Sequence, residues 1–182
     1  RGEFVTVKAT VVYAMASAER LPWYPSCPND IEDERNKGQV RKCNKRVSSS
    51  FGDESGGSWQ CTRCGSIGAP HYRYIYSAVL ADFSSSQTVT FFDDTAIELL
   101  GGTQAGDLVP LAEKAESGDK DAATALEKKF KEPLWRQSFV TLRCRMENVK
   151  DELRLQATVV RMRPVDFEYE SARLAEAIDS YF

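Results

Sequence analysis

The 182-residue sequence lacks several features that whole classes of protein require. It contains no run of 18 apolar residues, which argues against a membrane-spanning helix, and no signal-peptide core near its start. It holds a single histidine, and the segment GGTQAG does not have the spacing of a phosphate-binding P-loop. Its carboxylates are scattered rather than paired in a motif. We therefore expect neither an enzyme nor a membrane partner.

Charge and cysteine content narrow the choice further. The formal net charge of -3 gives no overall attraction to a polyanion, so nucleic-acid binding would need a local basic surface. Five cysteines, an odd number, fit a disulfide framework poorly and fit four metal ligands plus one further thiol well. This composition favours a reducing compartment. Because a strand-like segment follows the initial Arg1 at once, we expect a piece of a longer protein.

The order of the expected elements predicts a small barrel. Residues 4–14 read as a strand, residues 71–94 as a hairpin, and residues 138–165 as two further strands. A helical connection over 95–131 has a possible capping box at Thr95 and Glu98 and an N-cap at Asp119. Five strands with a helix between the third and fourth is the OB-fold arrangement. We predict a mainly β OB-fold over 1–165 and a C-terminal helix over 166–182.

An insertion over residues 26–70 interrupts this barrel. It reads as loop, because it is rich in Gly and Ser and because prolines at and before its start oppose regular structure. It also carries four of the five cysteines, and four thiolates hold Zn²⁺ in a closed tetrahedral site. The insertion is therefore predicted to be a zinc ribbon with one structural Zn²⁺, whose ligands are Cys27, Cys43, Cys61 and Cys64.

Alternatives to this metal site remain open at the level of sequence. Cys61 and Cys64 form a CxxC pair that could be a redox couple, although the flanks are not those of a redox motif. The cysteines could be unrelated buried thiols, or His71 could replace one of them as a ligand. A four-cysteine site also requires residues 28–42 to loop out between the first two ligands. Cys144, on a predicted strand, is expected to be a buried thiol.

The segments SCPN, CNKR, CTRC, YRYIYSAVLADF, VTFFDDTAIELLG and LRLQATVVRMRPVDF occur in an order that identifies a family. The chain resembles the C-terminal DNA-binding domain of the large subunit of replication protein A. That resemblance implies a nuclear protein of DNA replication, repair and recombination whose OB-fold carries a zinc ribbon and contacts single-stranded DNA. Two departures are a long spacing between Cys27 and Cys43 and Thr88 where some members have tryptophan.

An OB-fold binds oligonucleotides across its second and third strands, using aromatic faces for bases and cations for phosphates. Strand alternation turns Phe92 outward, at the family's aromatic position, and Arg73 and Ser77 with it. The segment RNKGQVRKCNKR adds six Lys or Arg within twelve residues. The predicted DNA contacts are Phe92, Arg73, Ser77, Thr90, Lys45, Arg46, Arg63, Arg143, Arg145 and Tyr72.

Each contact has a plainer reading. Phe92 could be ordinary core, Tyr72 and Tyr74 favour the core over a contact, and outward basic residues are usually just solvated. At the level of the whole chain, the alternative is a zinc-ribbon and OB module that binds proteins and contacts DNA little.

The C-terminal helix carries an apolar stripe that must cover something. It could pack on the barrel, or it could join helices of two smaller subunits, as the resemblance implies. The predicted subunit contacts are Leu174, Ile178, Tyr181 and Phe182.

Overall fold

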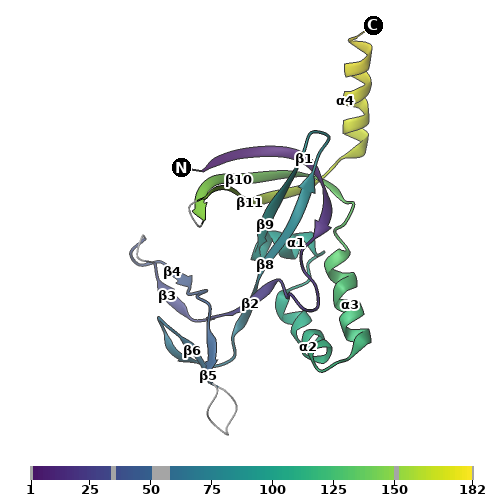
Figure 1. Cartoon of the computed structure of the whole chain (residues 1–182). Coiled ribbons are helices and arrows are strands. Elements are labelled where there is room, and N and C mark those ends of the chain that lie inside the picture. The colour runs from purple at the N-terminus through teal and green to yellow at the C-terminus, as the bar shows by residue number, and fades with distance from the viewer. Residues whose placement is uncertain (1, 34–35, 51–57, 150–151, 182) are drawn as a thin grey trace.

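The computed structural model describes residues 2–33, 36–50, 58–149 and 152–181. Within these ranges no helix is long and apolar enough to cross a membrane. Five long strands form the central barrel, and Figure 1 shows them curving around one another. They are β1 (Glu3–Ala14), β8 (His71–Ala81), β9 (Ser86–Phe92), β10 (Gln137–Val149) and β11 (Glu152–Pro164).

The barrel closes because β1 pairs with two different strands. Its first part runs antiparallel to β10, and its second part, from Thr10 to Ala14, runs antiparallel to β8. The remaining pairs are β10 with β11, β8 with β9, and the parallel pair of β11 with β9. This strand order, with helices between β9 and β10, confirms the predicted OB-fold.

The main core fills the barrel and the space under the connecting helices. Tyr74, Tyr76 and Phe91 are almost fully buried, and the two tyrosine hydroxyls donate to the carbonyls of Thr103 and Phe130. The connecting helices are α1 (Asp93–Leu99), α2 (Ala105–Glu116) and α3 (Lys120–Lys131).

The predicted start of α1 was wrong, whereas that of α3 was right. The chain passes directly from β9 into α1, with Phe92 as N-cap. The Thr95 hydroxyl donates to the Phe92 carbonyl at 2.9 Å, so Thr95 stands in the first turn and does not begin a capping box. Asp119 caps α3 as expected by accepting from the N–H groups of Asp121 and Ala122.

The insertion and the segment just before it contain strands where the sequence indicated loop. They are β2 (Trp23–Ser26), β3 (Asp30–Glu32), β4 (Val40–Lys42), β5 (Ser48–Ser50), β6 (Ser58–Cys61) and β7 (Gly65–Ile67). Pro25 is tolerated because β2 is an edge strand on β8, and the Pro25 carbonyl still accepts from Val47 N–H at 3.0 Å. Strand pairing within the insertion therefore supplies backbone partners that composition alone did not reveal.

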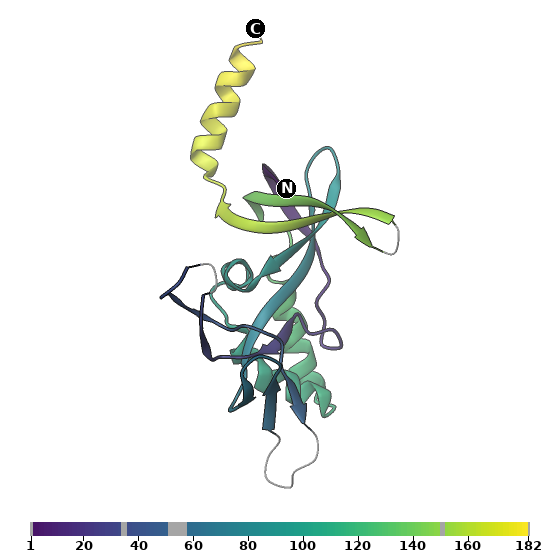
Figure 2. The same ribbon diagram turned by 90° about the vertical axis from the view of Figure 1, so that its left-hand side faces the viewer.

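The last helix, α4 (Phe167–Asp179), projects away from the barrel in both Figure 1 and Figure 2. Asp166 caps it by accepting from Tyr169 N–H at 3.1 Å. Phe167, Leu174, Ile178 and Tyr181 are all exposed, so the alternative that their stripe packs on the barrel was wrong. Phe182 lies outside the described residues.

Candidate metal centre and nucleic-acid interface

Four cysteine sulfurs meet at one point of the inserted module. The Sγ atoms of Cys27, Cys43, Cys61 and Cys64 all lie within 4.8 Å of one another, and those of Cys43 and Cys61 are 3.8 Å apart. No disulfide joins them, so all four remain thiols. His71 is not part of this group and instead begins β8 as an exposed residue. The arrangement can hold one metal ion with four sulfur ligands.

The first half of the centre depends on the hairpin of β3 and β4. Pairing of Asp30 with Lys42 returns the chain to its starting point, so that Cys43 N–H donates to the Asn29 carbonyl and Cys27 N–H to the Lys45 carbonyl, each at 2.8 Å. Residues 28–42 thus loop out as the four-cysteine site required. The long spacing between Cys27 and Cys43 is closed by this hairpin.

The second half is the turn between β6 and β7, where Cys61 pairs with Gly65. Gly65 has a φ of 78°, a left-handed conformation that glycine adopts without strain. Backbone N–H groups of Arg63 and Cys64 point at the Cys61 sulfur, and the Arg63 bond is the main reason why the pKa of Cys61 falls to about 7. Burial raises the pKa of Cys27 and Cys64.

The module has a small core of its own, which the sequence did not predict. Cys27, Cys43 and Cys61 are buried together with Val47 and Ile67, and Trp59 packs against them. This cluster is separate from the barrel core. Cys144 is half-buried and packs against the barrel core. The sequence predicted a buried Cys144, and the structure buries this side chain only in part.

The outward side chains of β8 and β9, here named the β8–β9 face, lie as strand alternation predicted. Val89 and Phe91 point inward, while Thr90 and Phe92 point outward and Phe92 is 48% exposed. Register places Ile75 beside Phe92 and Ser77 beside Thr90. The face therefore combines an exposed aromatic ring with hydroxyl groups.

Two hollows connect this face to the inserted module. One, of about 210 Å³, brings Ser77 and Ile75 together with Arg46 and Arg20. The other, of about 430 Å³, brings Arg73 together with Lys42. Residues from the barrel and from the cysteine module thus share one surface.

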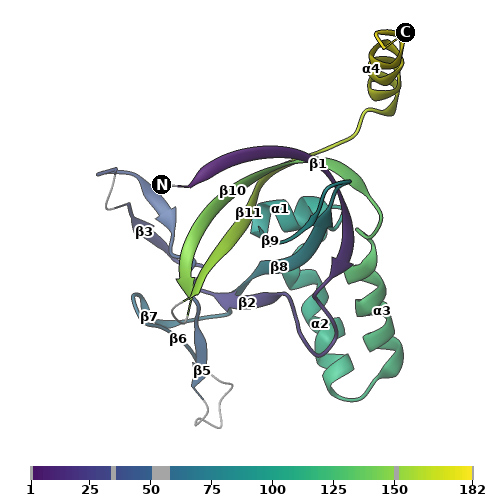
Figure 3. The same ribbon diagram turned by 45° about the horizontal axis from the view of Figure 1, so that its top comes forward.

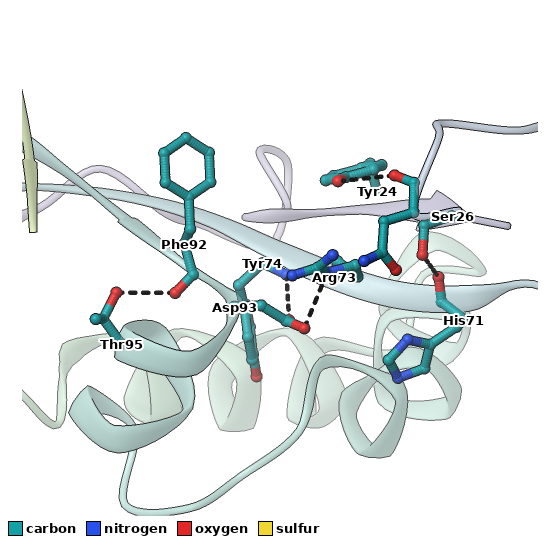
Figure 4. Close-up of polar contacts among 9 residues, drawn as sticks. Tyr24, Ser26, His71, Arg73, Tyr74, Phe92, Asp93 and Thr95 are labelled. Atoms are coloured by element: carbon teal, nitrogen blue, oxygen red, sulfur yellow. Dashed lines mark hydrogen bonds and ion pairs between the residues drawn. The ribbon is translucent and has the colours of Figure 1, made fainter. Parts of the chain in front are cut away.

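Tyr24 is a residue of this surface that sequence reasoning missed. It pairs in register with Arg73, and the Arg46 guanidinium lies 5.0 Å from the centre of its ring. Figure 4 shows Tyr24 and Phe92 on the same side of the sheet. Alternation along the four-residue strand β2 would have predicted an outward Tyr24, but the neighbouring prolines led us to predict a loop there.

Several predicted contacts are partly engaged elsewhere. Arg73 is half-buried, and its Nε lies 3.0 Å from an Asp93 oxygen. Tyr72 packs against the barrel core, on the same side of β8 as Tyr74. Lys45 donates to the Thr62 hydroxyl at 3.4 Å.

The remaining predicted contacts are solvent-accessible. Arg63 is exposed in the Cys61–Cys64 turn. Arg143 and Arg145 lie on β10, where Arg145 is exposed and Arg143 is half-buried.

Comparisons with known proteins agree with this architecture. The family model described as "Replication factor-A C terminal domain" matches residues 4–174. The chain is 32% identical over 177 residues to a 70 kDa DNA-binding subunit of replication protein A from Oryza sativa subsp. japonica, covering 97% of this chain and 24% of that protein. It is 30% identical over 176 residues to the 70 kDa DNA-binding subunit of Xenopus tropicalis, covering 96% of this chain and 24% of that protein.

Solved structures agree in fold. A chain of a replication protein A heterotrimer bound to ssDNA superposes with a TM-score of 0.75 at 28% identity, covering 100% of this chain and 36% of that one. A chain of yeast RPA bound to ssDNA gives a TM-score of 0.72 at 24% identity, covering 100% of this chain and 88% of that one. The chain spans about a quarter of the length of the curated relatives it matches. From a family match over almost its whole length, the chain belongs to the replication factor-A C-terminal domain family.

Proposed function

We propose that this chain binds single-stranded DNA without strong sequence preference, as part of a heterotrimeric replication and repair protein of the nucleus. The observation that carries the proposal is the exposed Phe92 on the β8–β9 face, next to cations from the barrel and the cysteine module. Bases of any identity can stack on an aromatic ring, and cations neutralise the phosphates. The solved relative bound to ssDNA at 28% identity supports the same function.

The proposed surface offers groups for both bases and phosphates. Register aligns Phe92 with Ile75 and Thr90 with Ser77, so that apolar and hydroxyl groups alternate along the two strands. Arg46, held over the Tyr24 ring, stands at the edge of the same surface. We assign base stacking to Phe92, and phosphate contacts to Arg46, Lys45, Arg63, Arg73, Arg143 and Arg145; Ser77, Thr90 and Tyr72 complete the proposed contact set.

The metal we propose for the cysteine centre is one Zn²⁺. A tetrahedral site with Zn–S bonds of about 2.3 Å places its sulfurs about 3.8 Å apart, which matches the separation of Cys43 and Cys61. Four sulfur ligands leave no position for a reacting water, so the ion would stabilise the module and perform no catalysis. The ion would contribute to DNA binding by holding rigid the turn that carries Arg63.

Assembly with two smaller subunits is proposed for residues 166–182, with residues 1–165 as the OB-fold, 26–70 as its ribbon and 95–131 as its helical connection. The exposed Leu174 and Ile178 on the projecting α4, with the exposed Tyr181 just after it, support this. Residues at these spacings share one helix face, as helix packing between chains requires.

Fluorescence anisotropy with labelled oligo-dT at several salt concentrations tests the proposed function. We expect the logarithm of the binding constant to fall linearly with the logarithm of salt concentration, because Lys and Arg side chains of the protein displace counterions from the phosphates. A protein-binding module without DNA contact would give no anisotropy change at any salt concentration, and that result would overturn the proposal.

A further inference from the structure

The outward side chains of β1, β10 and β11 form a second face, here named the convex face. Figure 3 shows these three strands as a curved layer around β8, β9 and α1. Strand register arranges the outward residues in three rows across the layer. The rows are Phe4, Arg143 and Thr158; Thr6, Thr141 and Arg161; and Lys8, Phe139 and Arg163.

The convex face is positively charged in a chain whose net charge is negative. Four of its arginines form no ion pair with a carboxylate in the described part of the chain: Arg143, Arg145, Arg161 and Arg163. Arg154, also outward on β11 and in register with Glu147, pairs with Glu152, and Lys8 pairs with Glu170. Register places each of these four arginines opposite a neutral residue, so no carboxylate faces them across the strands. Arginine side chains without a carboxylate partner can bind an anion. The charge pattern therefore suits a polyanion.

A hollow of about 270 Å³ lies within this charged surface, lined by Thr6, Phe139, Thr141, Arg161 and Arg163. The Arg163 guanidinium lies 4.5 Å from the centre of the Phe139 ring, which fixes its position. The hydroxyls of Thr6 and Thr141 lie 3.0 Å apart and offer further hydrogen-bonding groups. Arginine and threonine are side chains that bind phosphate oxygens.

The convex face is continuous with the β8–β9 face. Arg143 is in register with Thr158, Thr158 with Thr90, and Thr90 with Ser77. Side chains directly opposite one another on paired strands are only about 5 Å apart. Polar side chains in register thus lead from the β8–β9 face to Arg143.

We propose that the convex face carries a second stretch of the same single strand, beyond the part that lies on the β8–β9 face. This inference rests on the proposed function. In this proposal the sugar–phosphate backbone of the DNA crosses β9 and β11 at Thr90 and Thr158 and reaches Arg143. From there it follows β10 and β11 to Arg161 and Arg163. Continuity with the β8–β9 face favours a nucleic-acid backbone over an acidic protein segment as the occupant.

The test compares the unaltered chain with the double variant Arg161→Gln/Arg163→Gln on oligo-dT of increasing length. On the shortest oligomer that the unaltered chain binds, the variant should bind equally well. On longer oligomers it should bind more weakly, and the slope of log affinity against log salt should fall by about 1.4, because two phosphate contacts are lost at about 0.7 each. Replacing both arginines by lysine should restore most of the affinity.

The matched control is Lys114→Gln/Lys128→Gln, which removes two charges from exposed positions of α2 and α3. It should bind every length like the unaltered chain. Equal loss on short and long oligomers, or no loss on any length, would overturn the second stretch while leaving binding at the β8–β9 face intact. Failure of the unaltered chain to bind any oligomer would instead remove the proposed function itself.

Discussion

Lys8 of β1 and Glu170 of α4 form an ion pair with 2.7 Å between Nζ and Oε2, although 162 positions separate them in the chain. Arg173 donates to the same oxygen at 3.1 Å. Glu170 is the buried residue of a helix whose other described side chains are exposed. The ion pair therefore ties the first turn of α4 to the barrel and leaves the remaining turns free for a partner.

This pair leads to a prediction about pH. The hydrogen bond from Lys8 is the main cause that lowers the pKa of Glu170 below its usual 4.5. A lowered carboxyl pKa stabilises the fold above pH 4.5, and the stabilisation is lost as pH falls through the lowered value. In the Lys8→Met variant the Glu170 pKa should rise towards 4.5, as followed by NMR of the side-chain carboxyl carbon. An unchanged pKa would show that Lys8 does not hold the carboxylate.

Metal removal should affect the two cores differently. The cysteine module packs around Cys27, Cys43 and Cys61, apart from the barrel core. A strong chelator, or the substitution Cys61→Ser, should therefore disorder the module and leave the barrel folded, because structural zinc supplies much of the folding energy of small sites. NMR spectra and metal analysis by plasma mass spectrometry check this. Cys144→Ser is the control and should retain one zinc per chain.

Whether a feature of this structure could be predicted from the sequence depends on how far apart in the chain its residues lie. Alternation within β8 and β9 is local, so the inward Tyr76 and outward Phe92 could be assigned from the sequence alone. CxxC and a following glycine are likewise local, and they indicated the turn at Cys61. Several features that depend on neighbouring residues in the chain were therefore predicted correctly, although the local capping-box pattern at Thr95 was not.

Several features that depend on distant partners were missed, although the OB-fold and the meeting of the four cysteines were predicted. β2 forms because it pairs with β8, and Pro25 within it argued against a strand at the level of sequence. The start of α1 was misplaced because Asp93 is held by Arg73 and Tyr74 of β8, 20 and 19 positions earlier. The Lys8 and Glu170 pair and the alignment of Arg143 with Phe4 follow from strand order, which no local pattern encodes.

Replacing the exposed ring on β9 should weaken DNA binding. If a base stacks on Phe92, the Phe92→Ala variant should lose about 1–3 kcal/mol of binding free energy for oligo-dT. Phe83→Ala is the matched control, because Phe83 is fully exposed in the turn between β8 and β9. Anisotropy titrations measure both. Equal affinities for the two variants would assign Phe92 no stacking role.

Asp93 should prove structural. One of its oxygens accepts from Tyr74 N–H and the other from Arg73 Nε, each at 3.0 Å, as Figure 4 shows. Asp93→Ala leaves both donors without their partner, which should cost about 1–3 kcal/mol of unfolding free energy. Asp94→Ala, at the exposed neighbouring position, should cost little. Urea unfolding measures both variants, and equal stabilities would contradict this role.

Polar substitutions on the α4 stripe should separate assembly from stability. Leu174 and Ile178 are 48% and 58% exposed, so Leu174→Ser/Ile178→Ser should change the unfolding free energy of the isolated chain by only about 0.5 kcal/mol per site. If the two smaller subunits pack on this stripe, the double variant should no longer be retained with them in size-exclusion chromatography. Tyr169→Ser replaces an exposed residue five positions before Leu174, on a different side of the helix, and should assemble normally. Normal assembly of the double variant would show that the smaller subunits do not pack on Leu174 and Ile178, and that their contacts lie elsewhere on the chain.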